Sequence, residues 1–274
     1  MRSRFSIGPA PRVSDSRIHH RRFFVSAERI RDGWVEFAPG QAHQATHVLR
    51  LRPGDQVWVF DGTGRELIAS LATATPRRAT ARILGEAPRL PPARLRIALA
   101  QVVPRGPAMD FIVGKATELG VARIIPLEGE RSVRRASVAR SSRWLRIVQE
   151  AAEQCGRRDL PEVAPACTLD AFLLSHPGQT PLLACDAGRE SRPLLAACAQ
   201  LRGGSSLTLL VGGEGGLSPA EVGRLRSHGA RLVSLGPRIL RAETAALAAL
   251  AIVQAALGDW EFVGVSDSDR GSSS

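Results

Sequence analysis

The chain has 274 residues, of which 44% are hydrophobic, so it can bury a core as one large domain or two modest ones. It has no run of 18 apolar residues, so we expect no membrane-spanning helix. Its net charge is +11, and its single lysine, Lys115, is far from any glycine-rich loop, which excludes a P-loop nucleotide site.

The charge is unevenly distributed along the chain. The first 92 residues carry a net charge of +7 and the remaining residues carry +4. All basic residues but one are arginine, which binds phosphate bidentately and stacks on bases, although a GC-rich genome would produce the same bias. We therefore expect a basic nucleic-acid-binding appendage on a larger catalytic domain.

The cysteine and histidine spacings give no indication of a metal site. The four cysteines lack a CxxC pair and lie in apolar segments, so we expect reduced core thiols of a cytoplasmic protein. His43 and His47 are one helical turn apart, but no third ligand accompanies them. The pair is better explained as a surface or RNA-facing feature, and we expect no metal.

The N-terminal third contains two contrasting segments. Residues 1–20 are rich in arginine and serine, with one acid and no apolar periodicity, so we expect a disordered extension; a transit peptide would have the same composition. Residues 21–88 contain several short runs of strand character, which predicts a small β-barrel. The expected strands are Arg21–Val25, Gly33–Phe37, Val57–Phe60, Glu66–Leu71 and Ala79–Leu84, with a short helix at Gln41–Leu51 and an Asp61-Gly62 turn.

After a proline-rich linker at Arg89–Ala93, strands and helices alternate to about residue 260. Alternation on this scale is typical of βαβ units and a mainly parallel sheet. The expected strands are Leu95–Val103, Val121–Leu127, Leu182–Cys185, Ser206–Val211 and Ala230–Leu235, and the expected helices are Ala108–Leu119, Arg143–Cys155, Leu194–Leu201 and one ending at Gly258. We expect the Ser/Asp/Gly tail at residues 263–274 to be disordered.

Two glycine-bearing loops follow the last two strands. The first contains Gly212-Gly213-Glu214-Gly215-Gly216, and the second begins Gly236-Pro237-Arg238. Ser218, Pro219 and Glu221 then carry the start signals of a helix. Glycines at the carboxyl ends of neighbouring parallel strands allow a ligand to approach the backbone closely, although tight turns alone would also use them. A nicotinamide cofactor is disfavoured because the third glycine and the ribose-binding acid are missing.

The segments Val211–Ser218 and Leu235–Ala245 resemble the last two motifs of the ribosomal RNA small subunit methyltransferase E family. That family belongs to the SPOUT superfamily and methylates N3 of a uridine in small-subunit rRNA. Gly213 departs from the common motif, which has proline there. Further segments that resemble the family are Arg22–Phe24, His47–Asp55, Lys115–Val121 and Glu150–Arg157, so the resemblance extends from about Arg21 to Leu257.

The resemblance implies an α/β fold with two domains. The C-terminal domain, residues 94–260, is expected to be a knotted SPOUT-type domain with a mainly parallel sheet and a trefoil knot. The N-terminal domain, residues 21–88, is expected to be a small PUA-like β-barrel that binds RNA. A cytoplasmic homodimer is expected, with small-subunit rRNA, within the 30S subunit, as its partner.

The expected cofactor is S-adenosylmethionine, bound between the two glycine loops and the end of strand Leu182–Cys185. The expected cofactor contacts are Ala184, Gly212, Gly213, Gly215, Leu235, Gly236, Arg238, Ile239 and Leu240. The arginines expected to contact RNA are Arg22, Arg50 and Arg52 in the barrel and Arg131, Arg134 and Arg135, which belong to a run of six arginines without an acid at residues 131–146.

Catalysis is expected to depend on Arg241, with Glu214 and Glu243 as further candidates. Uridine N3 must lose its proton, and an arginine at a helix N-terminus would stabilise the resulting anion. Glu243 could instead complement the helix dipole, and Glu214 could instead bond to backbone amides. The alternative function is a non-enzymatic RNA-binding protein of ribosome assembly, which has no need of glycine loops.

Overall fold

The computed structural model describes residues 21–129, 138–188, 190–201 and 203–260. The contacts between Cα atoms divide these residues into two compact units. The first unit contains the described residues of 1–92, 110–124 and 136–165, and the second contains those of 93–109, 125–135 and 166–274. The two expected disordered ends and Arg131, Arg134 and Arg135 lie outside the described residues.

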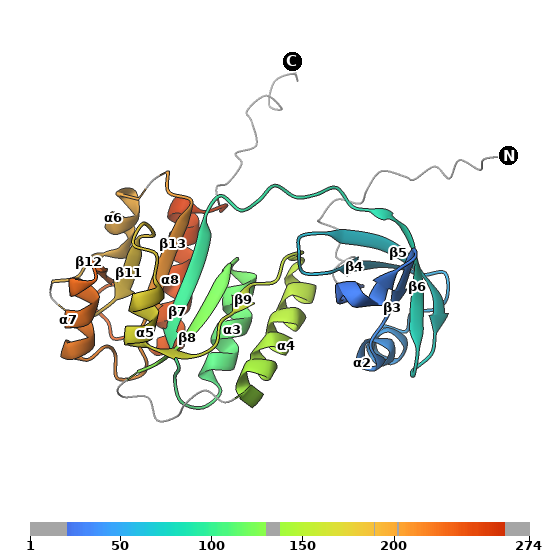
Figure 1. Ribbon diagram of the computed structural model, residues 1–274, viewed down its shortest axis with the longest axis horizontal. Helices are drawn as coiled ribbons and strands as arrows, with labels where there is room; N and C mark the ends of the chain where they lie inside the picture. Colours follow the sequence, from blue (N-terminus) through green and yellow to red (C-terminus); the bar gives the residue numbers. More distant parts are fainter. Residues whose placement is uncertain (1–20, 130–137, 189, 202, 261–274) are drawn as a thin grey trace, which may run out of the picture. The chain divides into compact units, whose positions relative to one another are not determined.

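The first unit contains a six-stranded sheet with the order β1-β4-β5-β6-β3-β2 (Figure 1). Only the β1–β4 pair is parallel. The five strands expected from the sequence are present as β1, β3, β4, β5 and β6, and β2 was not expected. The strands are β1 (Arg22–Phe24), β2 (Ile30–Arg31), β3 (Trp34–Glu36), β4 (Gln56–Phe60), β5 (Glu66–Ala74) and β6 (Ala79–Glu86).

Alternation along these strands builds the barrel core. Phe23, Val35, Val57 and Leu67 are buried in this core, and on β3 the buried Val35 lies between the exposed Trp34 and Glu36. The expected helix at Gln41–Leu51 begins earlier and is split. It consists of α2 (Pro39–His43) and a π-helical turn, η2 (Gln44–Val48), after a short 3₁₀ turn η1 (Ala27–Arg29).

Helices α3 (Ala108–Glu118) and α4 (Val138–Cys155) also belong to the first unit, apart from the start of α3. Asp110 joins the two helices, because its carboxylate accepts hydrogen bonds from Arg143 Nε at 2.6 Å and from Trp144 Nε1 at 3.0 Å. Glu153 on α4 accepts a hydrogen bond from the amide of Phe24 on β1 at 2.8 Å. Helix α4 is therefore tied to the barrel by polar contacts.

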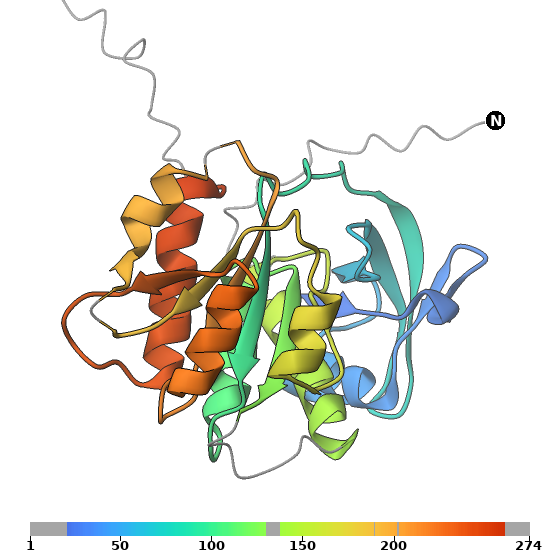
Figure 2. The same ribbon diagram turned by 60° about the vertical axis from the view of Figure 1, so that its left-hand side comes forward.

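The second unit contains most of a parallel sheet with the order β10-β8-β7-β13-β11-β14-β12. Helices α6 and α8 lie on one face and α5 and α7 on the other (Figure 2). Its elements are β7 (Arg96–Val102), β8 (Arg123–Glu128), β10 (Cys167–Thr168), α5 (Leu169–Ser175), β11 (Leu182–Cys185), β12 (Arg192–Pro193), α6 (Leu194–Ala199), β13 (Ser206–Val211), α7 (Pro219–Ser227), β14 (Arg231–Ser234) and α8 (Ala242–Leu257), while β9 (Glu162–Val163) pairs with β8.

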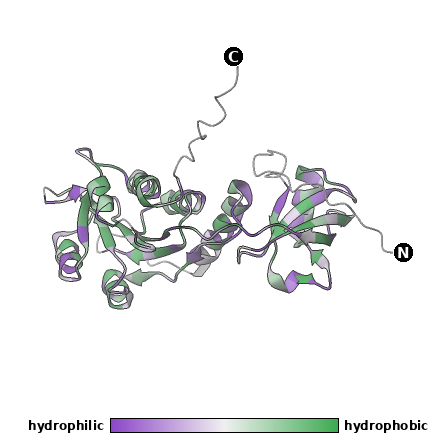
Figure 3. Cartoon of the chain, turned by 90° about the horizontal axis from the view of Figure 1, so that it is seen from above, coloured by the Kyte–Doolittle hydropathy of each residue, from purple (hydrophilic) through white to green (hydrophobic). Residues whose placement is uncertain are grey.

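Strands buried on both faces are almost wholly hydrophobic, as Figure 3 shows for this sheet. Strand β13 is an example, because Leu207, Leu209 and Leu210 are all buried. The sequence predicted β7, β8, β11, β13 and β14 but missed α5, β9, β10 and β12, which have only two to seven residues each. Among the helices of the described part of the chain, none is both long and apolar enough to cross a membrane.

Candidate active site

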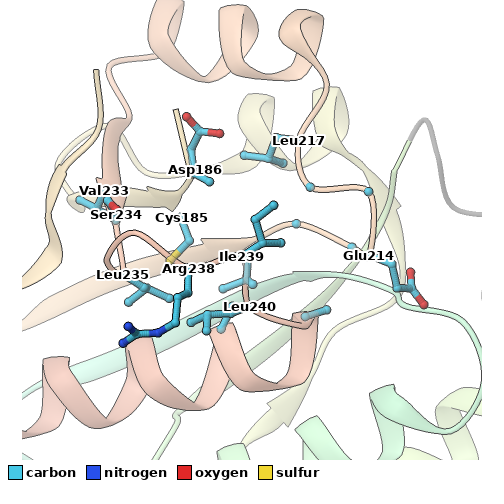
Figure 4. Close-up of a pocket in the computed structure, with 18 of the residues that line it drawn as sticks. Cys185, Asp186, Glu214, Leu217, Val233, Ser234, Leu235, Arg238, Ile239 and Leu240 are labelled. Atoms are coloured by element: carbon cyan, nitrogen blue, oxygen red, sulfur yellow. The ribbon is translucent and has the colours of Figure 1, made fainter. Parts of the chain in front are cut away.

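A cavity of about 400 Å³ lies where strands β11, β13 and β14 end (Figure 4). These strands are parallel neighbours, with Cys185 beside both Val211 and Val233. Ligands bind at this edge in open α/β sheets. The lining residues are Cys185, Asp186, Ala187, Val211, Gly212, Gly213, Glu214, Gly215, Gly216, Leu217, Val233, Ser234, Leu235, Gly236, Arg238, Ile239, Leu240, Ala242 and Ala245.

The first glycine loop folds back on itself directly after β13. The amide of Gly216 donates a hydrogen bond to the carbonyl of Gly213 at 3.0 Å, and Gly216 has a φ of +66°. A Cβ on Gly212 would lie 2.9 Å from the carbonyl carbon of Gly216, closer than real Cβ atoms approach. Gly212 is therefore required by the turn itself, and the turn exposes backbone to the cavity.

Both ends of this loop are anchored. Gln101 on β7 is fully buried, and its Nε2 donates to the carbonyls of Val102 at 2.8 Å and Gly212 at 3.1 Å. At the far end, Ser218 and Glu221 form the predicted capping box of α7, in which the Ser218 amide donates to Glu221 Oε2 at 2.7 Å and Ser218 Oγ accepts from the Glu221 amide at 3.1 Å. The loop is thus fixed at its entry and at its exit.

The second loop contributes an apolar wall. Gly236 has a φ of +108°, which L side chains rarely adopt, and its amide donates to Ser234 Oγ at 3.1 Å. Leu235, Ile239 and Leu240 line the cavity, and Ile239 is 94% exposed. Ala242 and Ala245 also line it, so the N-terminal turn of α8 lies against the cavity.

The third wall differs in detail from the prediction. Ala184 is fully buried within the sheet and does not line the cavity, because the wall begins one residue later. Cys185, Asp186 and Ala187 form it instead. The carboxylate of Asp186 accepts hydrogen bonds from the amide of Gly188 at 3.0 Å and from Ser191 Oγ at 3.1 Å, which holds the loop after β11.

The thiol of Cys185 lines the cavity but is not a nucleophile at neutral pH. Burial and, to a smaller extent, the neighbouring Asp186 carboxylate together raise its pKa to about 12. The thiolate is the reactive form of cysteine, so a thiol with this pKa stays neutral and inert. Among the described residues, no group of three or more His, Cys, Asp or Glu residues is arranged to hold a metal ion.

The arginines of the second loop are placed differently from one another. Arg238, one of the expected cofactor contacts, lines the cavity. Arg241 does not line it. Arg241 is the exposed N-cap residue of α8, and its carbonyl accepts a hydrogen bond from the Ala245 amide at 2.8 Å.

The two candidate glutamates also differ in position, because one lines the cavity and the other does not. Glu214 lines the cavity, and its Oε1 accepts a hydrogen bond from the backbone amide of Arg105 at 2.6 Å. Glu214 and Arg238 stand at opposite ends of the cavity in Figure 4, with Ile239 and Leu217 between them. Glu243 lies half-buried in the first turn of α8, outside the lining residues.

The expected RNA-binding arginines of the barrel differ in exposure. Arg50 and Arg52 are exposed, and Arg50 has a φ of +52°. Arg22 is buried, and its Nη2 lies 2.9 Å from Glu66 Oε1 and donates to the carbonyl of Arg157 at 3.1 Å. The assignment of Arg22 to RNA contact is therefore wrong, because its guanidinium is buried and contacts groups inside the protein.

Comparisons with known proteins define the class. A family model described as RNA methyltransferase domain matches residues 91–254, and one described as RNA methyltransferase PUA domain matches residues 40–84. The chain thus contains an RNA methyltransferase domain and a PUA domain. The boundaries predicted for the two domains remain predictions.

The relatives narrow the class to one family. The chain is 36% identical over 240 residues to the ribosomal RNA small subunit methyltransferase E of Synechocystis, covering 86% of this chain and 78% of the relative. It is 31% identical to the enzyme of the same name from Bacillus subtilis, covering 78% and 86%. The chain belongs to the ribosomal RNA small subunit methyltransferase E family.

Solved structures agree with this assignment. The crystal structure of a ribosomal RNA small subunit methyltransferase E from Neisseria gonorrhoeae, bound to S-adenosyl methionine, has a TM-score of 0.80 and 33% identity, covering 88% of this chain and 99% of that one. A methyltransferase from Legionella pneumophila in complex with the cofactor has a TM-score of 0.78 and 32% identity, covering 87% and 98%. The predicted fold class, a SPOUT-type parallel sheet with a PUA-like barrel, is confirmed.

Proposed function

We propose that this protein transfers a methyl group from S-adenosylmethionine to N3 of a uridine in small-subunit rRNA. The observation that carries the proposal is the cavity at the ends of β11, β13 and β14, enclosed by two glycine loops in a chain of this family. The similar proteins from Neisseria gonorrhoeae and Legionella pneumophila were crystallised with this cofactor, which supports the same ligand here.

The residues of the cavity fit the cofactor. Its volume of about 400 Å³ is in the range of small-molecule sites, and its walls combine apolar side chains with backbone groups. Leu235, Ile239 and Leu240 would pack against the faces of a flat aromatic ring such as adenine. Gly212 and Gly236 lack a Cβ where the turn and the backbone conformation forbid one, so polar backbone groups border the cavity.

S-adenosylmethionine supplies a methyl group that is already activated by its sulfonium, so the protein needs no metal and no nucleophile of its own. The chain must instead help uridine N3 to lose its proton, and the resulting negative charge spreads over two carbonyl oxygens. We propose that Arg241 stabilises this charge. Its guanidinium is carried at the N-terminus of α8, where the first-turn amides also favour an anion.

The roles of the two glutamates follow from their partners. Glu214 already accepts a hydrogen bond from the Arg105 amide, so we propose that it positions the glycine loop rather than accepting the proton of N3. Glu243 lies in the first turn of α8, where a negative charge stabilises the helix dipole. We propose that structural role for Glu243.

The wider predictions extend this function. We propose that the protein acts as a cytoplasmic homodimer, that its C-terminal domain contains a trefoil knot, and that its RNA substrate is packaged in the 30S subunit. Arg50 and Arg52, both exposed, are the barrel arginines that we retain from the sequence as RNA contacts. Arg131, Arg134 and Arg135 stay predictions.

Two measurements test the function. Thermal unfolding with S-adenosylmethionine at a hundred times its Kd should show a stabilisation of roughly 2.7 kcal/mol, whereas a protein that only binds RNA would show none. Mass spectrometry of small-subunit rRNA from cells lacking this protein should show the loss of one N3-methyluridine. An unchanged content of N3-methyluridine in the small-subunit rRNA of those cells would contradict the proposed reaction.

A further inference from the structure

A second recess, of about 410 Å³, lies on the barrel and is distinct from the cavity at the ends of β11, β13 and β14. It is formed by η1, strands β2 and β3, and the turn that precedes β6. No residue lines both cavities. The lining residues of this recess are Glu28, Arg29, Arg31, Trp34, Val35, Glu36, Arg78 and Thr80.

The recess contains an exposed aromatic side chain flanked by arginines. Trp34 is 47% exposed, while the next residue, Val35, is fully buried in the barrel core. In the sheet register Trp34 lies directly opposite Arg31 on β2 and Arg82 on β6. Residues directly opposite one another point to the same face, with Cβ atoms about 5 Å apart. The register therefore places Trp34 between two arginine residues on the outward face of the sheet.

The arginines of this face have no internal role. Arg29, Arg31, Arg78 and Arg82 are exposed, and within the described part of the chain none of their guanidinium groups forms an ion pair or a hydrogen bond. Arg65 on the same barrel, by contrast, pairs with Glu86 at 3.1 Å. These four arginines outnumber the nearby acids Glu28, Asp32 and Glu36, so the face remains positively charged.

Two tight turns hold these side chains in place. Asp32 and Gly33 have φ angles of +52° and +80°, as in the type I′ turns that suit a two-residue hairpin loop between β2 and β3. The turn before β6 is closed by the Thr75 amide, which donates to the Arg78 carbonyl at 2.9 Å, and by Thr75 Oγ1, which donates to the same carbonyl at 2.8 Å. Arg31, Trp34 and Arg78 are therefore presented on ordered backbone.

We infer that this face, which we call the Trp34 face (Arg29, Arg31, Trp34, Arg78 and Arg82), binds single-stranded RNA. A base stacks on the indole of Trp34, and the phosphates on either side contact Arg31 and Arg78. Single-stranded RNA fits because its bases are free to stack on an aromatic ring, whereas the bases of a duplex are already stacked on each other. The inference rests on the proposed function, which makes RNA the substrate.

The experiment measures RNA affinity with the full-length protein. Fluorescence anisotropy would follow the binding of a short single-stranded RNA oligonucleotide and of an RNA duplex of the same sequence. The variants are Trp34→Ala, Trp34→Phe and the double variant Arg31→Gln/Arg78→Gln. Arg65→Gln serves as the control, because it removes one positive charge from the same barrel outside the Trp34 face.

We expect Trp34→Ala to weaken binding of the single strand roughly tenfold, the scale of one lost base–aromatic stack, and to leave duplex binding unchanged. Trp34→Phe should keep most of the affinity, because phenylalanine still offers a ring. The double arginine variant should weaken binding and reduce the slope of log K against log salt by about 1.4, since each phosphate contact on a single strand contributes about 0.7.

Unchanged single-strand affinity in Trp34→Ala would overturn the inference, as would an equal loss for single strand and duplex. If Arg65→Gln weakens RNA binding, per charge removed, as much as the double arginine variant does, then only net charge matters. That result would also overturn the inference. Binding of S-adenosylmethionine, measured by calorimetry on the same variants, distinguishes failure of the proposed methyl-transfer function from failure of the Trp34 face as an RNA-binding site. A wild-type protein that binds RNA through Trp34 but does not bind the cofactor would disprove the proposed function and leave the Trp34 face standing.

Discussion

Arg22 and Glu66 form a buried ion pair in the barrel unit, with 2.9 Å between Nη2 and Oε1 and side chains that are only 5% and 3% exposed. Arg158, which follows α4, approaches the other carboxylate oxygen of Glu66 at 2.8 Å. One carboxylate thus lies between two guanidinium groups. Glu66 Oε1 and Arg22 Nε have no partner of good hydrogen-bond geometry in the described residues, so the contact on this side is mainly electrostatic.

The first prediction tests the structural role of Arg22. Arg22→Ala leaves part of the Glu66 charge buried without compensation, so we expect a loss of roughly 3–5 kcal/mol in the free energy of unfolding. RNA affinity should be unchanged at temperatures where the variant is folded. Arg52→Ala is the matched control, because Arg52 is exposed and its loss should weaken RNA binding with a stability change within about 0.5 kcal/mol. Denaturant unfolding measures the stability and anisotropy titrations measure the RNA affinity. An Arg22→Ala protein with full stability and weakened RNA binding would restore Arg22 as an RNA contact.

Arg22 also shows the limit of sequence reasoning. The local pattern predicted the strand correctly, but burial of the side chain depends on Glu66 and Arg158, which are far away in the sequence. The capping box of α7 was predicted in full because Ser218, Pro219 and Glu221 are local signals.

The walls of the cavity show the same difference between local signals, which the sequence reveals, and contacts with distant residues, which it does not. Both glycine loops were found because glycines after a strand are a visible pattern. Asp186 was missed, although it directly follows the predicted strand Leu182–Cys185, and the rule that ligands bind at the carboxyl ends of strands would have indicated it. Gln101 and the Arg105 amide could not be found, since their partners at Gly212 and Glu214 are set by the tertiary fold.

The second prediction concerns Gly236. A β-branched side chain at a φ of +108° strains the backbone of the cavity loop, so Gly236→Val should abolish binding of S-adenosylmethionine while leaving the protein folded. Gly229→Val is the matched control, because Gly229 also has a positive φ of +81° with open space around it but does not line the cavity. Calorimetric titration and thermal unfolding of both variants separate loss of the site from loss of stability. Equal cofactor affinities in the two variants would remove the second loop from the site.

The third prediction concerns Arg241. Because Arg241 lies outside the lining of the cavity, Arg241→Ala should bind the cofactor normally. Methyl transfer to rRNA should fall about a hundredfold or more, the usual scale for the loss of one preorganised donor. Arg238→Ala should behave in the opposite way, with weaker cofactor binding, because Arg238 lines the cavity. Single-turnover assays with saturating cofactor would measure the rates, and near-normal turnover of Arg241→Ala would transfer the role to another residue.

The fourth prediction separates two roles of Glu214. The Oε1 of Glu214 accepts the Arg105 amide at 2.6 Å, and glutamine keeps an oxygen at that position. Glu214→Gln should therefore retain both cofactor binding and turnover, whereas Glu214→Ala should weaken cofactor binding several-fold because the loop loses its anchor. If Glu214 were the base for uridine N3, glutamine could not take up the proton, and Glu214→Gln would lose turnover while keeping cofactor affinity. Rates and affinities of the two variants decide between these roles.

The fifth prediction concerns the pH dependence of stability in the barrel unit. Burial raises the pKa of Glu153, the hydrogen bond from the Phe24 amide opposes the rise and the nearby Glu150 adds to it, and together these causes bring the pKa from its ordinary value of 4.5 to about 7. The folded protein therefore holds a proton on Glu153 that the unfolded chain has already released between these two pH values. Because the folded state binds more protons there, this group destabilises the protein progressively as the pH rises from about 5 to about 7, and the full cost persists above that range.

Glu153→Gln removes this titration and keeps an oxygen that can accept the Phe24 amide. We expect the variant to match the wild type in Tm at about pH 5 and to exceed it at about pH 8, where the wild-type carboxylate is charged and still buried. Glu162→Gln, which changes an exposed carboxylate on β9 of the same unit, is the control, and its Tm difference from wild type should change little with pH. Thermal unfolding across the pH range measures the effect. A Tm difference between Glu153→Gln and wild type that stays constant from pH 5 to 8 would show that the buried carboxylate does not titrate in this window and would contradict the prediction.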